Sequence, residues 1–150
     1  MDATQLPAGL VAIGNAPRAT HFERIGGVEL ISRLVERFYQ HMDSLPEART
    51  IRALHPLDLG PVKQVLVSFL VEWMGGEKVY SAEHGHPRLR MRHMSFPVDS
   101  AARDAWMGCM RQALADTVED ADLRTQLEQA FFKTADFLRN QQESHHDHHR

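Results

Sequence analysis

The chain has 150 residues, of which 43% are hydrophobic and 25% charged, so it can bury a core of ordinary size as a single domain. Its formal net charge of -3 gives no electrostatic reason to expect nucleic acid or a membrane surface as a partner. The single cysteine, Cys109, excludes an intrachain disulfide. No apolar run approaches the ~18 residues of a membrane-spanning helix. The N-terminus also lacks a signal-peptide pattern, so we expect a cytoplasmic protein.

The first half of the chain contains two amphipathic patterns. Residues 1–20 hold two prolines and two glycines without periodicity, which predicts an N-terminal extension. One helix is predicted after Gly26-Gly27 and should stop near Pro46. Residues 46–61 read as irregular. A second helix is predicted from Pro61 to Gly75-Gly76, because its apolar residues repeat at helical spacing: Val62, Val65, Leu66, Phe69, Leu70 and Trp73.

The second half predicts further helices and no strand. Residues 80–85 read as a loop and residues 87–94 as a short helix. Asp99 or Ser100 is expected to cap a longer helix, and a last one carries apolar residues up to Leu138. The tail, residues 142–150, holds four histidines and reads as disordered, with metal binding only adventitious. The fold class is therefore all-α, with one domain at residues 21–141 between two extensions.

The segment 75–93 concentrates unusual chemistry, with three histidines and three alternating arginines after the glycine pair. His93 follows Leu89 by four residues, so both lie on one face of the predicted short helix. By itself His93 could be an ordinary, partly buried histidine. A zinc site formed by His84, His86 and His93 is a second possibility, although the spacing matches no common closed zinc motif. Residue chemistry alone leaves these alternatives open.

Several ordered motifs resemble the group II truncated haemoglobins, the compact bacterial and plant globins. They cover residues 22–140 and are Gly26-Gly27, Arg37-Phe38-Tyr39, Gly75-Gly76 with Tyr80, the stretch from Gly85 to His93 with Phe96, and Asp104-Ala105-Trp106-Met107-Gly108-Cys109-Met110. Ordered motifs at matching separations are more specific than any one motif alone. The resemblance implies a truncated globin, a two-over-two helical sandwich around one haem.

The resemblance also implies roles for individual residues. His93 becomes the proximal iron ligand, and Tyr39, His55 and Trp106 become the polar groups of the distal side. His55 is the least secure alignment, because a loop of variable length precedes it. Arg92 is the candidate for a haem propionate, since a guanidinium pairs bidentately with a carboxylate. The implied haem pocket adds Phe38, Val62, Leu66, Phe69, Leu70, Leu89 and Phe96.

The expected function is reversible binding of dioxygen and other diatomic ligands, among them carbon monoxide and nitric oxide, at a non-covalent haem b. No Cys-X-X-Cys-His pattern for covalent attachment occurs. The alternative is a haem enzyme, a nitric oxide dioxygenase or a peroxidase, served by an unknown reductase. A remote alternative is a haem-free metal-binding helical module. The sequence is compatible with a monomer or a homodimer.

Overall fold

The computed structural model describes residues 19–84 and 99–148, and this part of the chain is helical without a strand. The order of elements is α2 (His21–Ile25), α3 (Gly27–Ser44), η1 (Pro46–Ala48), α4 (Arg49–Ala53), α5 (Gly60–Trp73), α6 (Val79–His84), α8 (Ser100–Thr117) and α9 (Ala121–His148). The predicted all-α class is confirmed. Within the described ranges, no helix is both long and apolar enough to cross a membrane.

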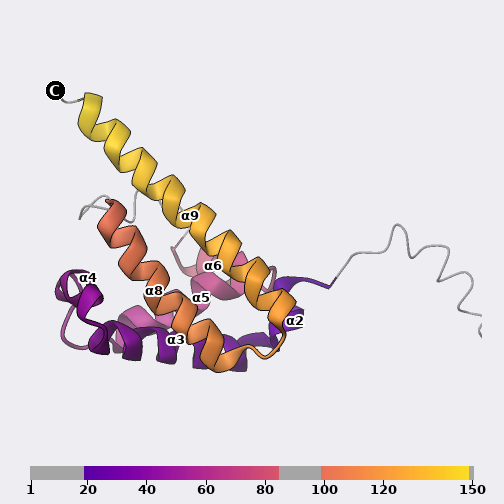
Figure 1. The fold of residues 1–150 in the computed structure, drawn as a ribbon. Coiled ribbons are helices and arrows are strands. Elements are labelled where there is room, and N and C mark those ends of the chain that lie inside the picture. Colours follow the sequence, from indigo (N-terminus) through magenta and orange to yellow (C-terminus); the bar gives the residue numbers. More distant parts are fainter. Residues whose placement is uncertain (1–18, 85–98, 149–150) are drawn as a thin grey trace, which may run out of the picture.

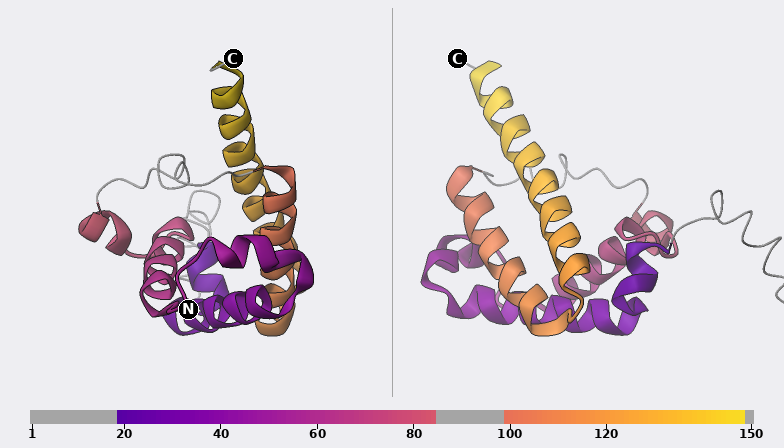
Figure 2. Two further views of the ribbon diagram at one scale, coloured as in Figure 1. Left: turned by 90° about the vertical axis from the view of Figure 1, so that its left-hand side faces the viewer. Right: turned by 45° about the vertical axis from the view of Figure 1, so that its right-hand side comes forward.

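Two helix pairs make the body of the fold. The helix α3 packs against both α5 and α8, and α8 packs against α9. In Figure 1, α3 lies at the base, while α8 and α9 rise from it side by side. The views in Figure 2 agree that the C-terminal part of α9 extends past the first turn of α8. The two-over-two arrangement expected from the sequence is confirmed by this packing.

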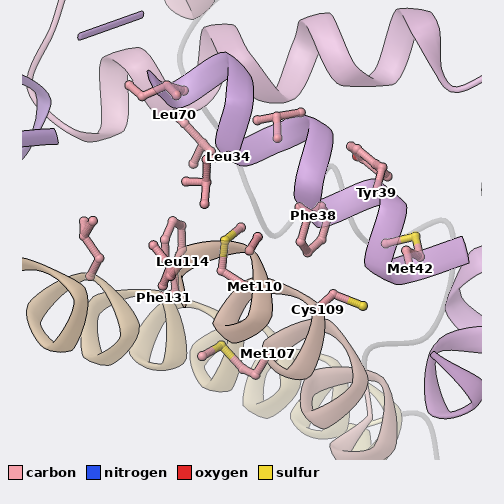
Figure 3. Packing of buried hydrophobic residues seen from close by; sticks show 14 of the residues in the cluster. Leu34, Phe38, Tyr39, Met42, Leu70, Met107, Cys109, Met110, Leu114 and Phe131 are labelled. Atoms are coloured by element: carbon pink, nitrogen blue, oxygen red, sulfur yellow. The ribbon is translucent and has the colours of Figure 1, made fainter. Parts of the chain in front are cut away.

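The core fills the space between these helices. Figure 3 shows its centre, where Leu34 and Phe38 of α3 face Met110 and Leu114 of α8. These side chains are at most 1% exposed. Burying a side chain of this size stabilises the fold by roughly 1.5–3 kcal/mol. The contact between α3 and α8 is therefore what holds the two pairs together.

Four short helices were missed by the sequence analysis. The segment 80–85 was predicted as a loop, but Val79–His84 forms α6, where Glu72 of α5 accepts hydrogen bonds from the amide and the hydroxyl of Ser81. The segment 46–61, read as irregular, contains η1 and α4. Thr20 begins α2 with a capping box to Glu23. Such helices are too short for a periodic pattern and depend on caps and tertiary contacts.

The longer helices follow the predictions closely. Asp99 caps α8, as one of the two expected residues, by accepting a hydrogen bond from the amide of Ala102 at 2.8 Å. The helix α9 runs further than predicted, because its backbone stays helical to His148 whereas residues 142–150 were expected to be disordered. Extending an existing helix needs no new nucleation, which explains the added turns.

Candidate functional site

Two aromatic neighbours on α3 form the centre of the candidate site. Phe38 is 1% and Tyr39 is 5% exposed, and their ring centroids are 4.9 Å apart in an edge-on arrangement. Successive residues of a helix point about 100° apart, and Figure 3 shows the two side chains leaving α3 in different directions. Trp106 of α8 packs on Phe38, with the ring centroids 5.1 Å apart. The ring of Phe38 therefore contacts both other rings and separates Tyr39 from Trp106.

The phenol of Tyr39 is a buried polar group. Loss of solvent raises its pKa to about 12, so the hydroxyl keeps its proton at physiological pH. Within residues 19–84 and 99–148, neither this hydroxyl nor the indole N–H of Trp106 has a hydrogen-bond partner. Buried polar groups are nearly always hydrogen-bonded in folded proteins. The buried phenol of Tyr39 therefore indicates a place where a ligand supplies an acceptor, and the partly exposed indole of Trp106 is a second donor on the other side of Phe38.

His55 joins this cluster from the loop that follows α4. Its partly buried ring lies edge-on to Tyr39, with the centroids 5.9 Å apart. Its Nδ1 is 2.8 Å from the carbonyl oxygen of Ile51. Since a carbonyl only accepts, Nδ1 carries the proton, and Nε2 is the nitrogen left to accept or exchange one. The structure thus brings the ring of His55 into contact with that of Tyr39.

One residue that the sequence analysis missed fixes this loop. Arg52 donates from NH1 to the carbonyl oxygen of Pro56 at 3.0 Å and from NH2 to that of Leu57 at 3.3 Å. Its Nε donates to the carboxylate of Asp43 near the end of α3. The planar guanidinium makes these bonds in one fixed geometry. Arg52 therefore ties the His55 loop to α3, and only its tertiary contacts reveal this role.

The helix α5 contributes the apolar side. Val62, Leu66 and Phe69 are partly buried against the core, while Leu70 is 1% exposed and belongs to the core itself. Phe69 also meets Tyr80 of α6 edge-on, with the centroids 5.4 Å apart. Val62, Leu66 and Phe69 supply an apolar surface of the kind that a flat, hydrophobic cofactor needs.

An aromatic row continues from Trp106 to α5. Phe131 of α9 meets Trp106 at a centroid distance of 5.7 Å. On its other side, Phe131 stacks on Trp73 of α5 at 4.6 Å, with the ring planes 21° apart. Both indoles are partly exposed. The sequence placed Trp73 on an apolar helix face, but its contact with Phe131 is visible only in the structure.

The proximal half of the predicted site lies outside the described residues. This applies to His93, Leu89, Arg92 and Phe96, and to the short helix expected at 87–94. His86 and His93 of the alternative zinc site also lie outside the described residues. The haem ligand and the zinc site therefore both stay predictions. In the described segments, no three His, Cys, Asp or Glu side chains are grouped so as to hold a metal ion.

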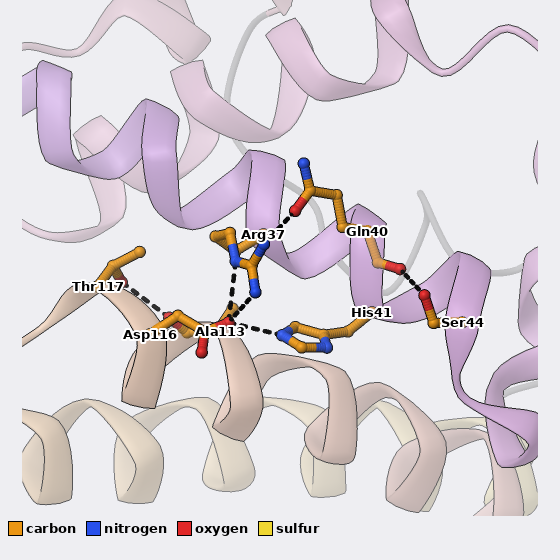
Figure 4. Close-up of polar contacts among 7 residues, drawn as sticks. All are labelled: Arg37, Gln40, His41, Ser44, Ala113, Asp116 and Thr117. Carbon is orange, nitrogen blue, oxygen red and sulfur yellow. Dashed lines mark hydrogen bonds and ion pairs between the residues drawn. The ribbon is translucent and has the colours of Figure 1, made fainter.

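Electrostatic contacts brace the helices around the aromatic cluster. Figure 4 shows Asp116 of α8 accepting from His41 and Arg37 of α3. The hydrogen bond from His41, followed by that from Arg37, holds the pKa of this carboxyl below its ordinary value. The bracing lies on the face of α3 that meets α8 and fixes the spacing of these two helices near the site.

Comparisons with known proteins agree with this geometry. Residues 20–140 match the family model of the bacterial-like globins. Group 2 truncated haemoglobin YjbI of Bacillus subtilis is 36% identical over 130 residues, covering 87% of this chain and 92% of the relative. The cold-adapted truncated haemoglobin of the Antarctic marine bacterium Pseudoalteromonas haloplanktis has a TM-score of 0.78 and 38% identity, over 80% of this chain and 97% of that chain. The group II 2-on-2 haemoglobin of Agrobacterium tumefaciens has a TM-score of 0.77 and 39% identity, over 82% and 95% of the two chains.

Proposed function

Because the chain belongs to the bacterial-like globin family, as a group II truncated haemoglobin that binds haem, we propose that it holds one non-covalent haem b and binds dioxygen reversibly at the iron. His93 is the proposed axial ligand. The bound haem supplies the iron at which a diatomic gas is held. The chain supplies the polar environment on the opposite side, through Tyr39, Trp106 and His55.

The observation that carries the proposal is the unsatisfied hydrogen-bonding capacity of the aromatic cluster. The phenol of Tyr39 is buried and protonated, and it finds no acceptor in the described part of the chain. A polarised dioxygen, which carries partial negative charge, is an acceptor that this donor and the Trp106 indole fit. The apolar side chains of α5 suit the porphyrin. The donor set and its surroundings therefore fit a haem with a gas ligand.

A non-covalent haem also fits the cysteine content. Cys109 is the chain's one cysteine and is 0% exposed inside the core. Covalent attachment would need cysteine sulfurs at the haem edge, next to a histidine ligand. The haem would thus be retained without a covalent bond to sulfur, by the axial ligand, apolar contact and a contact to a propionate. Arg92 is the proposed partner of a propionate, since a guanidinium matches a carboxylate.

The ligand assignment is tested by absorption spectra of the ferrous protein with and without carbon monoxide. We expect a carbon monoxide complex in the wild type and loss of haem retention in His93→Ala. His86→Ala, a change in the same segment, is the matched control and should retain haem. Normal retention with an unchanged spectrum in His93→Ala would refute the assignment. Absence of a Soret band after haem addition, with stoichiometric zinc instead, would support the haem-free alternative.

The distal assignment is tested by the dissociation rate of dioxygen in stopped flow. Tyr39→Phe and Trp106→Phe each remove one neutral donor, worth ~0.5–1.5 kcal/mol, so each should speed release by up to about tenfold. Tyr80→Phe removes a phenol from a different cluster and should leave the rate unchanged. An unchanged rate in both distal variants would contradict the proposed hydrogen bonds.

A second candidate function, peroxidase-like turnover, is favoured by the geometry of His55. Its Nδ1 is bound to the carbonyl of Ile51, so Nε2 remains for proton exchange. Histidine is the side chain best suited to act as acid and base near neutral pH. Multiple turnover with peroxide and a reductant, lost in His55→Phe while carbon monoxide still binds, would establish this function. Turnover at the wild-type rate in that variant would exclude the role of His55.

A further inference from the structure

Among the aromatic side chains of the chain, the two tryptophans and two tyrosines are the ones that lose an electron readily. Three of them, Tyr39, Trp106 and Trp73, belong to one continuous aromatic row. Phenylalanine is much harder to oxidise than indole, so Phe131 and Phe38 act in this row as bridges and not as carriers. One ring, Phe131, is all that separates the two indoles.

From this row we propose that Trp73 is an electron-entry site, at which bulky phenols too large for the haem pocket are oxidised by way of Trp106. The proposal rests on the haem site and the peroxide chemistry proposed above. It adds a second substrate position on α5, away from Tyr39 and His55. The substrate class is a one-electron donor of the phenol type, and the oxidant is hydrogen peroxide.

The ring contacts give the route of the electron, and the exposure of each ring favours one end of the row. Trp73 stacks on Phe131 at 4.6 Å and Trp106 meets the same ring at 5.7 Å, so each step crosses direct ring contact. An oxidised ring must also release its proton. Tyr39 is 5% exposed and has no hydrogen-bond acceptor in the described residues, which disfavours that release. Trp73 is partly exposed and can pass the indole proton to water.

The electron balance over one turnover is complete. An electron leaves Trp106 for the pocket and is replaced from Trp73, whose indole N–H proton goes to solvent. A phenol then returns one electron and one proton to Trp73 and becomes a phenoxyl radical. Two phenols supply two electrons and two protons in this way. One hydrogen peroxide takes them up as its O–O bond breaks, and two waters are formed.

The experiment uses the haem-loaded protein, hydrogen peroxide and a phenol in two forms, free and coupled to a dextran too large to enter the site. Rapid freezing followed by electron paramagnetic resonance detects the radical, and mass spectrometry locates the oxidised residue. We expect a tryptophan radical, oxidation at Trp73, and oxidation of both phenols by the wild type. Trp73→Phe should lose the radical at that position and the oxidation of the dextran-linked phenol.

Two further variants sharpen the test. Phe131→Leu keeps both indoles but removes the bridge, and it should also lose oxidation of the dextran-linked phenol. Tyr80→Phe keeps the ring that contacts Phe69 but removes the oxidisable phenol, which stands outside the row, and it should behave as the wild type. A variant that fails to fold is recognised by its loss of carbon monoxide binding. If Trp73→Phe fails in this way, Trp73→Tyr is used instead. Its phenol can carry the electron in the stack on Phe131, so oxidation of the dextran-linked phenol should be restored.

The outcomes separate this proposal from the one on which it rests. A wild type that retains no haem overturns both. If the wild type binds haem and carbon monoxide but is oxidised at Tyr80, the electron-entry site alone is overturned. The same holds if Trp73→Phe oxidises the dextran-linked phenol as well as the wild type does. The electron-entry site is supported if the wild type is oxidised at Trp73 and this oxidation disappears in Phe131→Leu.

Discussion

His41 and Asp116 bind each other across the contact between α3 and α8, with 2.6 Å between Nε2 and Oδ2. Arg37 reaches the same carboxylate oxygen, with both its Nε and its NH2 at 2.9 Å. One carboxylate therefore receives two side chains from consecutive turns of α3, as Figure 4 shows. This contact is the main polar connection between the helix that carries Tyr39 and the helix that carries Trp106.

The first prediction concerns Asp116→Asn and acid stability. Because the carboxyl pKa is lower in the folded chain than its ordinary 3.8, the ionised form stabilises the fold above that ordinary value. The contribution disappears as the pH falls through the lower, folded value. We expect the variant to lose ~0.2–1 kcal/mol at pH 7, typical of a partly exposed pair. In urea unfolding, the free energies of unfolding of the wild type and Asp116→Asn should converge at acidic pH. Glu119→Gln, which changes a nearby exposed acid, should match the wild type at pH 7 and at acidic pH.

The second prediction concerns Arg52. Arg52→Ala removes three hydrogen bonds that hold the loop after His55, so the ring of His55 should lose its fixed position against Tyr39. We expect the dioxygen dissociation rate to change as it does in His55→Ala. Arg49→Ala, on the same short helix and exposed, is the control. Arg52→Lys should not restore the wild-type rate, because an ammonium lacks the planar fork; full recovery would mean that charge alone matters.

The third prediction compares two glycines. A Cβ on Gly76 would stand 2.8 Å from Cδ1 of Phe22 and 2.9 Å from Cγ1 of Val71, so Gly76→Ala forces a shift in packed side chains. We expect a loss of roughly 1–3 kcal/mol in the free energy of unfolding. A Cβ on Gly108, in the interior of α8, meets nothing within 4 Å. Gly108→Ala should therefore gain roughly 0.5–1 kcal/mol. Chemical unfolding that shows equal effects would refute this account of Gly76.

The fourth prediction concerns the thiol of Cys109. Burial raises the pKa of this thiol to about 11, and its side chain is 0% exposed. Since the thiolate is the reactive form, a thiol reagent at pH 8 should label the native protein very slowly. Labelling should become fast in denaturant, and its native rate should rise in destabilised variants such as Gly76→Ala. Rapid labelling of the stable wild type would show that Cys109 is reached without unfolding.

The sequence predicted the elements whose residues repeat at helical spacing. Apolar residues recur over several turns in α3 and α5, and each helix is bounded by glycine or proline, so both helices were located to within a few residues. The six residues of α6 hold no such period. That helix depends on the carboxylate of Glu72, nine residues before Ser81, and on packing that no local pattern reveals.

The site was predicted as a set of residue types, and the structure adds their arrangement. The motif resemblance selected Tyr39, Trp106 and His55, and the aromatic contacts through Phe38 join all three. Arg52 could not be selected in the same way, because an arginine in a short polar stretch usually faces solvent. Its role follows from carbonyl groups whose direction only the folded loop defines.

The placement of the two indoles makes the chain its own optical probe. Both Trp73 and Trp106 touch Phe131, so intrinsic fluorescence monitors the meeting point of α5, α8 and α9. The helices α2 and α4 carry no indole and contribute only to the circular dichroism signal. Comparing the melting curve followed by fluorescence with the one followed by circular dichroism therefore tests the cooperativity of unfolding without any label. Coincident curves would show a two-state transition, whereas an earlier fluorescence change would locate the first opening at this junction.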